Sequence, residues 1–191
     1  MNDLNVRIGL IASLAERCPQ LGRTALMKYC YFLQTLRRVP LGYRFSLYSY
    51  GPFDSGVLAD LDAAEATGSV KIDIVYYPGG YGYRIESGQR AEISKQRAAN
   101  FLHEYQSDID WVVQEFGALN ASELELASTV LYCDREAHQK HGTLTRDQLA
   151  RRVHDVKPHF TLEQVRSGAD DLHGRGLLES ISGGVRGASG A

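Results

Sequence analysis

Residues 45–53 read Phe-Ser-Leu-Tyr-Ser-Tyr-Gly-Pro-Phe, and this stretch decides the fold. The side chains alternate over 45–50, which predicts a strand with two usable faces. Gly51-Pro52 is a turn signal that ends the strand, and Asp54-Ser55 can cap a new helix. Two tyrosines, a rigid turn and a further aromatic residue therefore predict a ring-lined surface beside a helix N-terminus.

The elements around this stretch follow the order of a winged-helix domain with an elaborated middle. Apolar residues at helical spacing predict a helix over 6–16 and a second one that begins near Thr24, a candidate N-cap. A third helix is expected over 55–67, where a glycine follows it. The alternating runs 70–76 and 81–85 predict a hairpin that turns on Pro-Gly-Gly.

The second half of the chain is predicted to be helical before it repeats this order. A long helix over 93–116 comes first, and a further helix runs to about residue 141. Two short helices capped by Thr145 and Thr161 then lead to a short strand over 177–180. We interpret this segment as a second winged-helix-like unit.

The predicted fold class is therefore α+β and mainly helical, with two winged-helix-like units joined by helices. We expect the first unit to cover 1–90, and the helical linker with the second unit to cover 91–182. Residues 183–191 are rich in Gly, Ser and Ala, which predicts a disordered tail. The long helix over 93–116 could pair with a copy of itself, so a homodimer is one expectation for assembly.

The composition is that of an ordinary soluble globular protein, with 43% hydrophobic and 23% charged residues. No apolar run approaches the ~20 residues that span a bilayer, and the N-terminus lacks the layout of a signal peptide. The three cysteines, Cys18, Cys30 and Cys133, lie far apart. Their odd number favours small buried thiols in a reducing cytosol over a disulfide framework. We therefore expect a cytoplasmic protein.

The net charge of −2 differs from the basic excess of most nucleic-acid-binding proteins. A winged-helix transcriptional regulator is still an alternative, because the helix over 162–173 could enter a major groove. Its candidate nucleic-acid contacts are the basic residues Arg146, Arg151, Arg152, Lys157 and Arg166. The same helix carries Glu163, Asp170 and Asp171, which repel phosphates and favour contact with a protein.

No motif of a serine hydrolase, a phosphate-binding loop or a zinc protease occurs in the chain. The densest titratable cluster begins at Cys133, but on a helix His138 would lie about 140° away from it, so we expect no metal and no cofactor. Arg135 and His141 have the Arg-x4–6-His spacing of HEPN ribonucleases, in which the histidine acts as acid or base. A helix end complemented by His and Lys is the simpler interpretation, and a ribonuclease is a minor alternative.

Seven aromatic rings gather within 36 residues, which is more than one small hairpin can bury. They could be sheet packing, since tyrosine favours strands. They could also form a protein interface, since tyrosine offers rigid amphipathic contact area. The candidate partner-binding residues are these rings and the proline of the turn: Tyr48, Tyr50, Pro52, Phe53, Tyr76, Tyr77, Tyr81 and Tyr83.

Two sequence motifs point to a family. A helix pattern of the form Lys-Leu-x-Lys-Leu-x-Tyr-Phe-x-Gln is matched at Lys28, Tyr31, Phe32 and Gln34. A Tyr-Gly-Pro-aromatic turn over 50–53 precedes a helix with spaced leucines that ends in glycine, matched at Leu58, Asp60, Leu61 and Gly68. Together they resemble the Panacea (SocA-like antitoxin) and YwgA-like family over about residues 20–75, and the YwgA-like branch more closely.

The resemblance implies a small cytoplasmic bacterial or phage-related protein that binds another protein. Such a protein would neutralise a toxin or deliver it to a protease, and the resemblance implies no catalytic residue. We therefore expect a non-enzymatic protein-binding module, antitoxin-like or an adaptor, from a toxin–antitoxin or defence locus.

Overall fold

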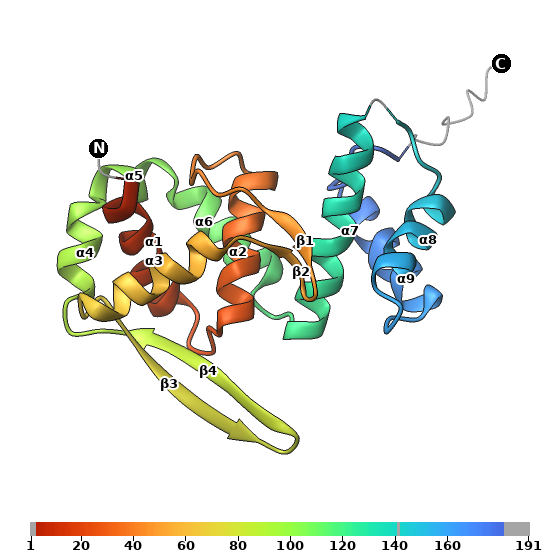
Figure 1. Cartoon of the computed structure of the whole chain (residues 1–191). Coiled ribbons are helices and arrows are strands. Elements are labelled where there is room, and N and C mark those ends of the chain that lie inside the picture. The colour runs from red at the N-terminus through yellow and green to blue at the C-terminus, as the bar shows by residue number, and fades with distance from the viewer. Residues whose placement is uncertain (1–2, 141, 182–191) are drawn as a thin grey trace. The chain divides into compact units, whose positions relative to one another are not determined.

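The computed structural model describes residues 3–140 and 142–181, and this part of the chain is a mainly helical α+β protein. Nine helices and two small antiparallel hairpins lie within these residues (Figure 1). The chain divides into two compact units, residues 1–125 and 126–191. None of the described helices has both the length and the apolar character that a membrane span requires.

The first unit contains both hairpins and most of the helices (Figure 1). Its elements are α1 (Asp3–Arg17), α2 (Arg23–Leu36), β1 (Ser46–Tyr48), β2 (Gly51–Phe53), α3 (Ser55–Ala66), β3 (Val70–Tyr77), β4 (Gly80–Ser87), α4 (Ala91–Arg97), α5 (Ala99–Glu104) and α6 (Gln106–Phe116). Helix α7 (Ala121–Gln139) begins in the first unit and continues into the second. The second unit adds α8 (Arg146–Val156) and α9 (Leu162–Gly174).

The core of the first unit forms around α2, whose apolar stripe steps by three and four residues as the sequence predicts. Leu26, Phe32 and Leu33 are completely buried. The ring of Phe32 stacks on Phe116 of α6, with 4.0 Å between the ring centroids. This contact fixes α6 against α2, so the hydrophobic core includes residues well beyond the predicted 1–90 unit.

The division into compact units therefore differs from the one expected from the sequence. Helix α4 packs closely on α1 at Gly9, where an added Cβ would lie 2.4 Å from the Cβ of Ala98 and 2.9 Å from the carbonyl oxygen of Ser94. Only glycine permits this approach of two helix backbones. Since α4 and α6 both pack on the first two helices, the boundary lies after Glu125 and not at 90–91.

The single helix expected over 93–116 is three helices, α4, α5 and α6, separated by turns at Ala98 and Tyr105. Each piece directs its own apolar residues inward, as the buried Phe101 of α5 and Ile109 of α6 show. Changes of direction allow the segment to follow the core, which one straight helix could not do. The homodimer expectation relied on one long helix, and the described residues do not form it.

The stretch over 45–53 forms a tight hairpin of its own. Tyr48 pairs with Gly51, so the turn consists of Ser49 and Tyr50, while Gly51-Pro52, the predicted turn, lies in the returning strand β2. Gly51 has a φ of +84°, which glycine adopts without steric cost. Asp54 caps α3 as predicted, since its side chain accepts the N–H of Gly56.

The second unit has the helices that the sequence predicts but not the strand. Thr145 and Thr161 each form a capping box, at the start of α8 and α9 respectively. No strand forms over 177–180, because the buried carboxylate of Asp134 accepts the backbone N–H groups of Glu179 and Ser180. The predicted tail, 183–191, lies outside the described residues.

Candidate functional site

The β3–β4 hairpin has two faces of different character. Strands pair in register from Val70 opposite Ser87 to Tyr77 opposite Gly80, and side chains alternate between the faces. One face carries Val70, Ile72, Ile74, Tyr76, Tyr81, Tyr83 and Ile85, and the other carries mainly charged residues and glycine. The first set forms an apolar face of the kind that normally packs on a core.

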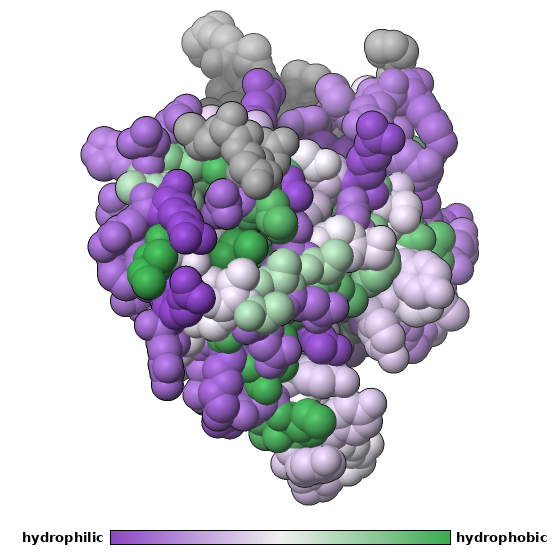
Figure 2. Space-filling view, turned by 60° about the vertical axis from the view of Figure 1, so that its left-hand side comes forward, coloured by the Kyte–Doolittle hydropathy of each residue, from purple (hydrophilic) through white to green (hydrophobic). Residues whose placement is uncertain are grey.

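Only the base of this apolar face is covered. Val70 and Ile85 are buried, whereas Ile74, Tyr76 and Tyr81 are 53%, 78% and 57% exposed. Pale and green shades predominate at the lower end of Figure 2, where the hairpin projects (Figures 1 and 2). We call Ile74, Tyr76, Tyr81 and the half-buried Tyr83 the tyrosine face.

Tyr77 lies on the opposite face and has a structural contact. Its ring packs over the backbone of Gly82, where an added Cβ would lie 3.3 Å from Cε1 of the ring. Its hydroxyl donates a hydrogen bond of 2.9 Å to the carbonyl oxygen of Tyr81. Tyr77 therefore holds the tip of the hairpin, although 56% of the residue is exposed.

The β1–β2 hairpin presents a second group of rings. Tyr48 and Tyr50 are largely exposed, and Phe53 is half-buried. The ring centroids of Tyr48 and Phe53 are 5.7 Å apart. Pro52 is buried, and its carbonyl oxygen accepts a 2.7 Å hydrogen bond from Nζ of the buried Lys28. Pro52 thus supports this surface from beneath and does not form part of it.

The polar residues of the two family-like motifs hold the segment between α2 and α3 in place. Lys28 binds Pro52, and the Gln34 amide exchanges two hydrogen bonds with the backbone of Tyr43. The Tyr43 hydroxyl donates to Asp60, which is also paired with Arg7 at 2.6 Å. Burial is the main cause that raises the pKa of Tyr43 above its ordinary value, and Cys30 and the Asp60 carboxylate raise it further. These residues hold the segment that carries the β1–β2 ring group.

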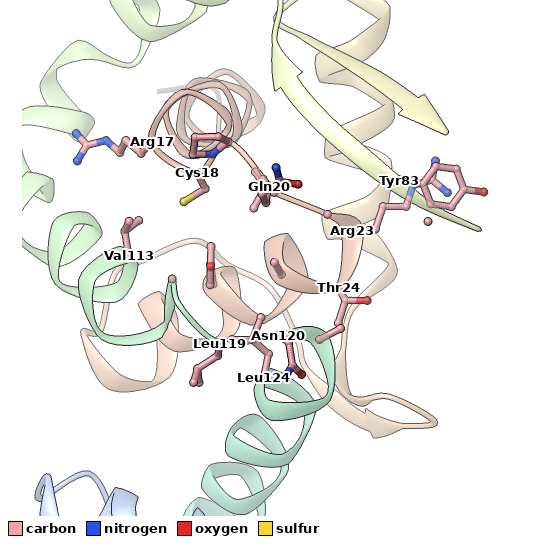
Figure 3. Close-up of a pocket in the computed structure, with 18 of the residues that line it drawn as sticks. Arg17, Cys18, Gln20, Arg23, Thr24, Tyr83, Val113, Leu119, Asn120 and Leu124 are labelled. Atoms are coloured by element: carbon pink, nitrogen blue, oxygen red, sulfur yellow. The ribbon is translucent and has the colours of Figure 1, made fainter. Parts of the chain in front are cut away.

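Arg23, the first residue of α2, lies between the two ring groups. Its guanidinium stacks on the ring of Tyr83, 3.7 Å from the centroid, as the close-up of this region shows (Figure 3). A cavity of about 810 Å³ lies on one side, lined among others by Arg23, Tyr81 and Tyr83. A smaller one of about 210 Å³ lies on the other side and is lined by Arg23, Thr24, Tyr48, Tyr50 and Phe53. Arg23 and Thr24 line both cavities, so the two hairpins contribute to one continuous surface.

The N-cap of helix α2 lies two residues earlier than the sequence predicts. The cap is Gly22, with no side-chain hydrogen bond, and Thr24, the expected cap, lies inside the first turn. Among the described residues, the first backbone N–H of this helix with a hydrogen-bond acceptor is that of Leu26, which bonds to Gly22. The N–H groups that precede it belong to partly exposed residues at the positive end of the helix dipole.

The larger cavity also contains a cysteine. Burial raises the pKa of Cys18, and the nearby Arg17 lowers it by less. The thiol is therefore mainly protonated at neutral pH, which makes it a weak nucleophile. Cys30 and Cys133 are buried, and burial raises their pKa values to about 12 and about 11.

The basic residues proposed for nucleic-acid contact are mostly engaged within the second unit. Arg146 pairs with Asp170 at 3.1 Å, and Arg166 pairs with Asp147 at 3.0 Å. Arg152 pairs with Glu136 at 2.5 Å, Lys157 is buried, and Arg151 is exposed. Their charge is therefore largely met by carboxylates, which weakens attraction to phosphates.

Arg135, the candidate ribonuclease residue, is largely buried and holds the segment that follows α9. Its guanidinium contacts Asp134 at 2.7 Å, Glu179 at 3.3 Å and the carbonyl oxygen of Leu177 at 3.0 Å. His141 lies outside the described residues. Among the residues that the structure describes, no group of three or more His, Cys, Asp or Glu side chains could hold a metal ion.

The sequence indicates the rings but gives no sign of Arg23 or of the two cavities. The ring positions are visible as a local excess of tyrosine, whereas the stacking of Arg23 on Tyr83 joins residues 60 positions apart. Comparison of the chain with protein-family models, with curated proteins and with solved structures finds no match.

Proposed function

We propose that this chain is a non-enzymatic protein-binding module, antitoxin-like or an adaptor, which binds a protein partner through the tyrosine face. The exposure of Ile74, Tyr76 and Tyr81 carries this proposal. An apolar face that continues past the core into solvent is typical of an interaction site. Tyrosine also contributes more to interfaces than most residues, because its rigid ring loses little conformational entropy on binding.

The family resemblance supports the same proposal and suggests the class of partner. In the Panacea and YwgA-like pattern the partner is a toxin, or a protein that is delivered to a protease. Lys28 supports the β1–β2 ring group through the carbonyl oxygen of Pro52, and Gln34 holds the backbone of Tyr43 ahead of β1. A structural role for these residues agrees with a binding protein and requires no reaction.

We further propose that the first unit is winged-helix-like. Helices α1, α2 and α3 precede the β3–β4 hairpin, and the N–H of Ile85 donates to the carbonyl oxygen of Leu21 between α1 and α2. In a winged-helix sheet, a third strand between the first two helices pairs with the hairpin, and this bond joins the same two segments. Helix α3 lies where a recognition helix would, but it contains two Asp, one Glu and no Lys or Arg. That charge favours a protein partner over a nucleic acid.

The test is affinity capture from cells of the native host, with quantitative identification of what is retained. The wild-type chain is compared with Tyr76→Ser/Tyr81→Ser, which removes the exposed rings of the tyrosine face. We expect at least a tenfold loss of one specific partner, with an unfolding midpoint close to that of the wild type because both rings are solvent-exposed.

The matched control is Lys71→Ser/Asp73→Ser on the opposite face of the same hairpin, where the two side chains form an exposed ion pair. This control changes the same strands without removing a ring. Equal capture by the wild type and by the tyrosine double variant would show that the tyrosine face is not the interface. A large drop in stability of that variant would show that the rings are part of the core.

A further inference from the structure

The charges that surround Arg23 have one sign. The described residues that line the two cavities include Arg17, Arg23 and Lys28 but no Asp or Glu. Arg17 pairs with Asp110 of α6. Glu123 in the first turn of α7 does not line the cavity, and its carboxylate accepts the N–H of Asn120. In a chain whose net charge is −2, this surface is locally positive.

Arg23 is a cation of this surface that forms no ion pair with a described carboxylate. No described carboxylate lies within ion-pair distance of it, and its Nε is buried without a hydrogen-bond acceptor in the described part of the chain. A buried donor without an acceptor costs about 1–3 kcal/mol. The stacking on Tyr83 holds the guanidinium in place. Arg23 as a whole is partly exposed and lines both cavities, so a group entering either cavity can reach the side chain.

The surface next to Arg23 adds further donors and apolar contacts. The first-turn N–H groups of the uncapped α2 lie beside it. Rings flank it on both sides, Tyr81 and Tyr83 in the larger cavity and Tyr48 and Phe53 in the smaller one. A carboxylate bound at Arg23 would therefore lie between the rings of the larger cavity and those of the smaller cavity.

We propose that the partner binds here with an extended acidic segment, and that one Asp or Glu side chain of this segment pairs with Arg23 at the start of α2. The neighbouring apolar side chains of the segment contact the rings of the two hairpins. This inference rests on the proposed protein-binding function and adds the chemistry of the bound segment. Charge complementarity supports an acidic segment, because a cation and the first N–H groups of α2 lie together where no carboxylate of the described residues lines either cavity.

The test is selection from a phage-displayed library of random dodecapeptides against the full chain. We expect the wild type to enrich peptides with Asp or Glu at a fixed position between apolar residues. One selected peptide is then synthesised with its acidic residue intact or changed to the amide. Wild-type affinity should fall at least tenfold with the amide peptide, and Arg23→Gln should bind both peptides equally weakly.

The control is Arg97→Gln on α4, which removes one exposed positive charge outside both cavities and should retain wild-type affinity. Enriched peptides without an acidic preference would overturn the inference. If Tyr76→Ser/Tyr81→Ser nevertheless fails to bind them, the proposed function stands. Absence of any enriched peptide would also overturn the inference. The affinity-capture experiment described above would then decide the proposed function separately.

Discussion

The guanidinium carbon of Arg23 lies 3.7 Å above the ring centroid of Tyr83. This stacking joins the start of α2 to β4, and the N–H of Ile85 in β4 bonds nearby to the carbonyl oxygen of Leu21, in the turn before α2. The projecting hairpin is thus attached to the body of the first unit at its base. Tyr81 continues from this attachment toward the tip, with its ring 5.8 Å from that of Tyr83.

The first prediction concerns the energy of this stacking. A cation–π pair of intermediate exposure contributes about 0.5–2 kcal/mol. We expect a double-mutant cycle of Arg23→Gln and Tyr83→Leu to give a coupling free energy of about 1 kcal/mol in urea denaturation. Tyr83→Phe keeps the ring and should retain most of the coupling. Additive effects of the two substitutions would show that the stacking does not stabilise the fold.

The second prediction concerns the buried carboxylate of Asp134. This side chain is completely buried and accepts hydrogen bonds from the backbones of Glu179 and Ser180, from the Ser180 hydroxyl and from Arg135. In Asp134→Asn, an amide group would face these donors, and Arg135 would lose the nearer of its two carboxylate partners and keep only Glu179. We expect a loss of about 2–4 kcal/mol of unfolding free energy.

The control for this prediction is Asp170→Asn on α9, which breaks an exposed ion pair with Arg146. Such pairs contribute about 0–1 kcal/mol, so a small change is expected. Hydrogen exchange at the amides of Glu179 and Ser180 gives a local readout, and it should accelerate only in Asp134→Asn. Unchanged protection there would contradict the role given to Asp134.

Asp134 also explains why one part of the fold could not be predicted. The caps at Thr145 and Thr161 follow from residues three positions apart, and the β3–β4 hairpin follows from alternation around a Pro-Gly turn. These are local signals, and the structure confirms them. The apolar run over 177–180 gives the local signal of a strand, but its N–H groups bind a carboxylate 45 residues earlier in the chain. No local pattern contains that partner.

The candidate site also combines features with a local sequence signal and features that depend on residues distant in the chain. Its tyrosines are visible as a local excess in the sequence, and the strand period separates Tyr76 and Tyr81 from Tyr77. Their exposure depends on where the core ends, which is a property of the packed unit. Arg23 gave no signal of its own, because an arginine at the start of a helix is common and its partner ring comes from β4.

The third prediction concerns Gly9 in the middle of α1. Alanine normally stabilises a helix interior by about 1 kcal/mol relative to glycine. At Gly9 we expect the opposite sign, a loss of about 1–3 kcal/mol, because the new methyl group would meet Ala98 at 2.4 Å and force α4 away. Gly174→Ala at the end of α9 is the control, since no atom lies within 4 Å of its added Cβ.

Urea denaturation of the two alanine variants measures the change in unfolding free energy that each substitution causes. Gly174→Ala should change the unfolding free energy by no more than about 0.5 kcal/mol. A Gly9→Ala variant that is as stable as the wild type would show that α4 does not pack on α1 as described. The boundary of the first unit would then lie closer to residue 90.

The fourth prediction is a loss of stability at alkaline pH. Burial raises the pKa of Cys30 to about 12, with a further increase from Asp60, and burial raises that of Tyr29 to about 12. Both groups are neutral when protonated, so the folded state keeps its protons at a pH where the unfolded chain has lost them. The stability that this contributes is complete below the unfolded pKa values of about 9–10 and is lost as pH rises toward 12.

At pH 10 the Cys30 thiol alone should reduce the unfolding free energy by about 1 kcal/mol relative to pH 7. Cys30→Ala removes this titration, so the stability of the variant should fall less steeply between pH 7 and pH 10. The cavity that the substitution leaves lowers stability equally at both pH values and does not change this slope. Tyr50→Phe, which changes an exposed ring, should keep the wild-type slope. Urea midpoints measured at several pH values distinguish these slopes. If Cys30→Ala falls as steeply as the wild type, the buried thiol does not cause the alkaline loss.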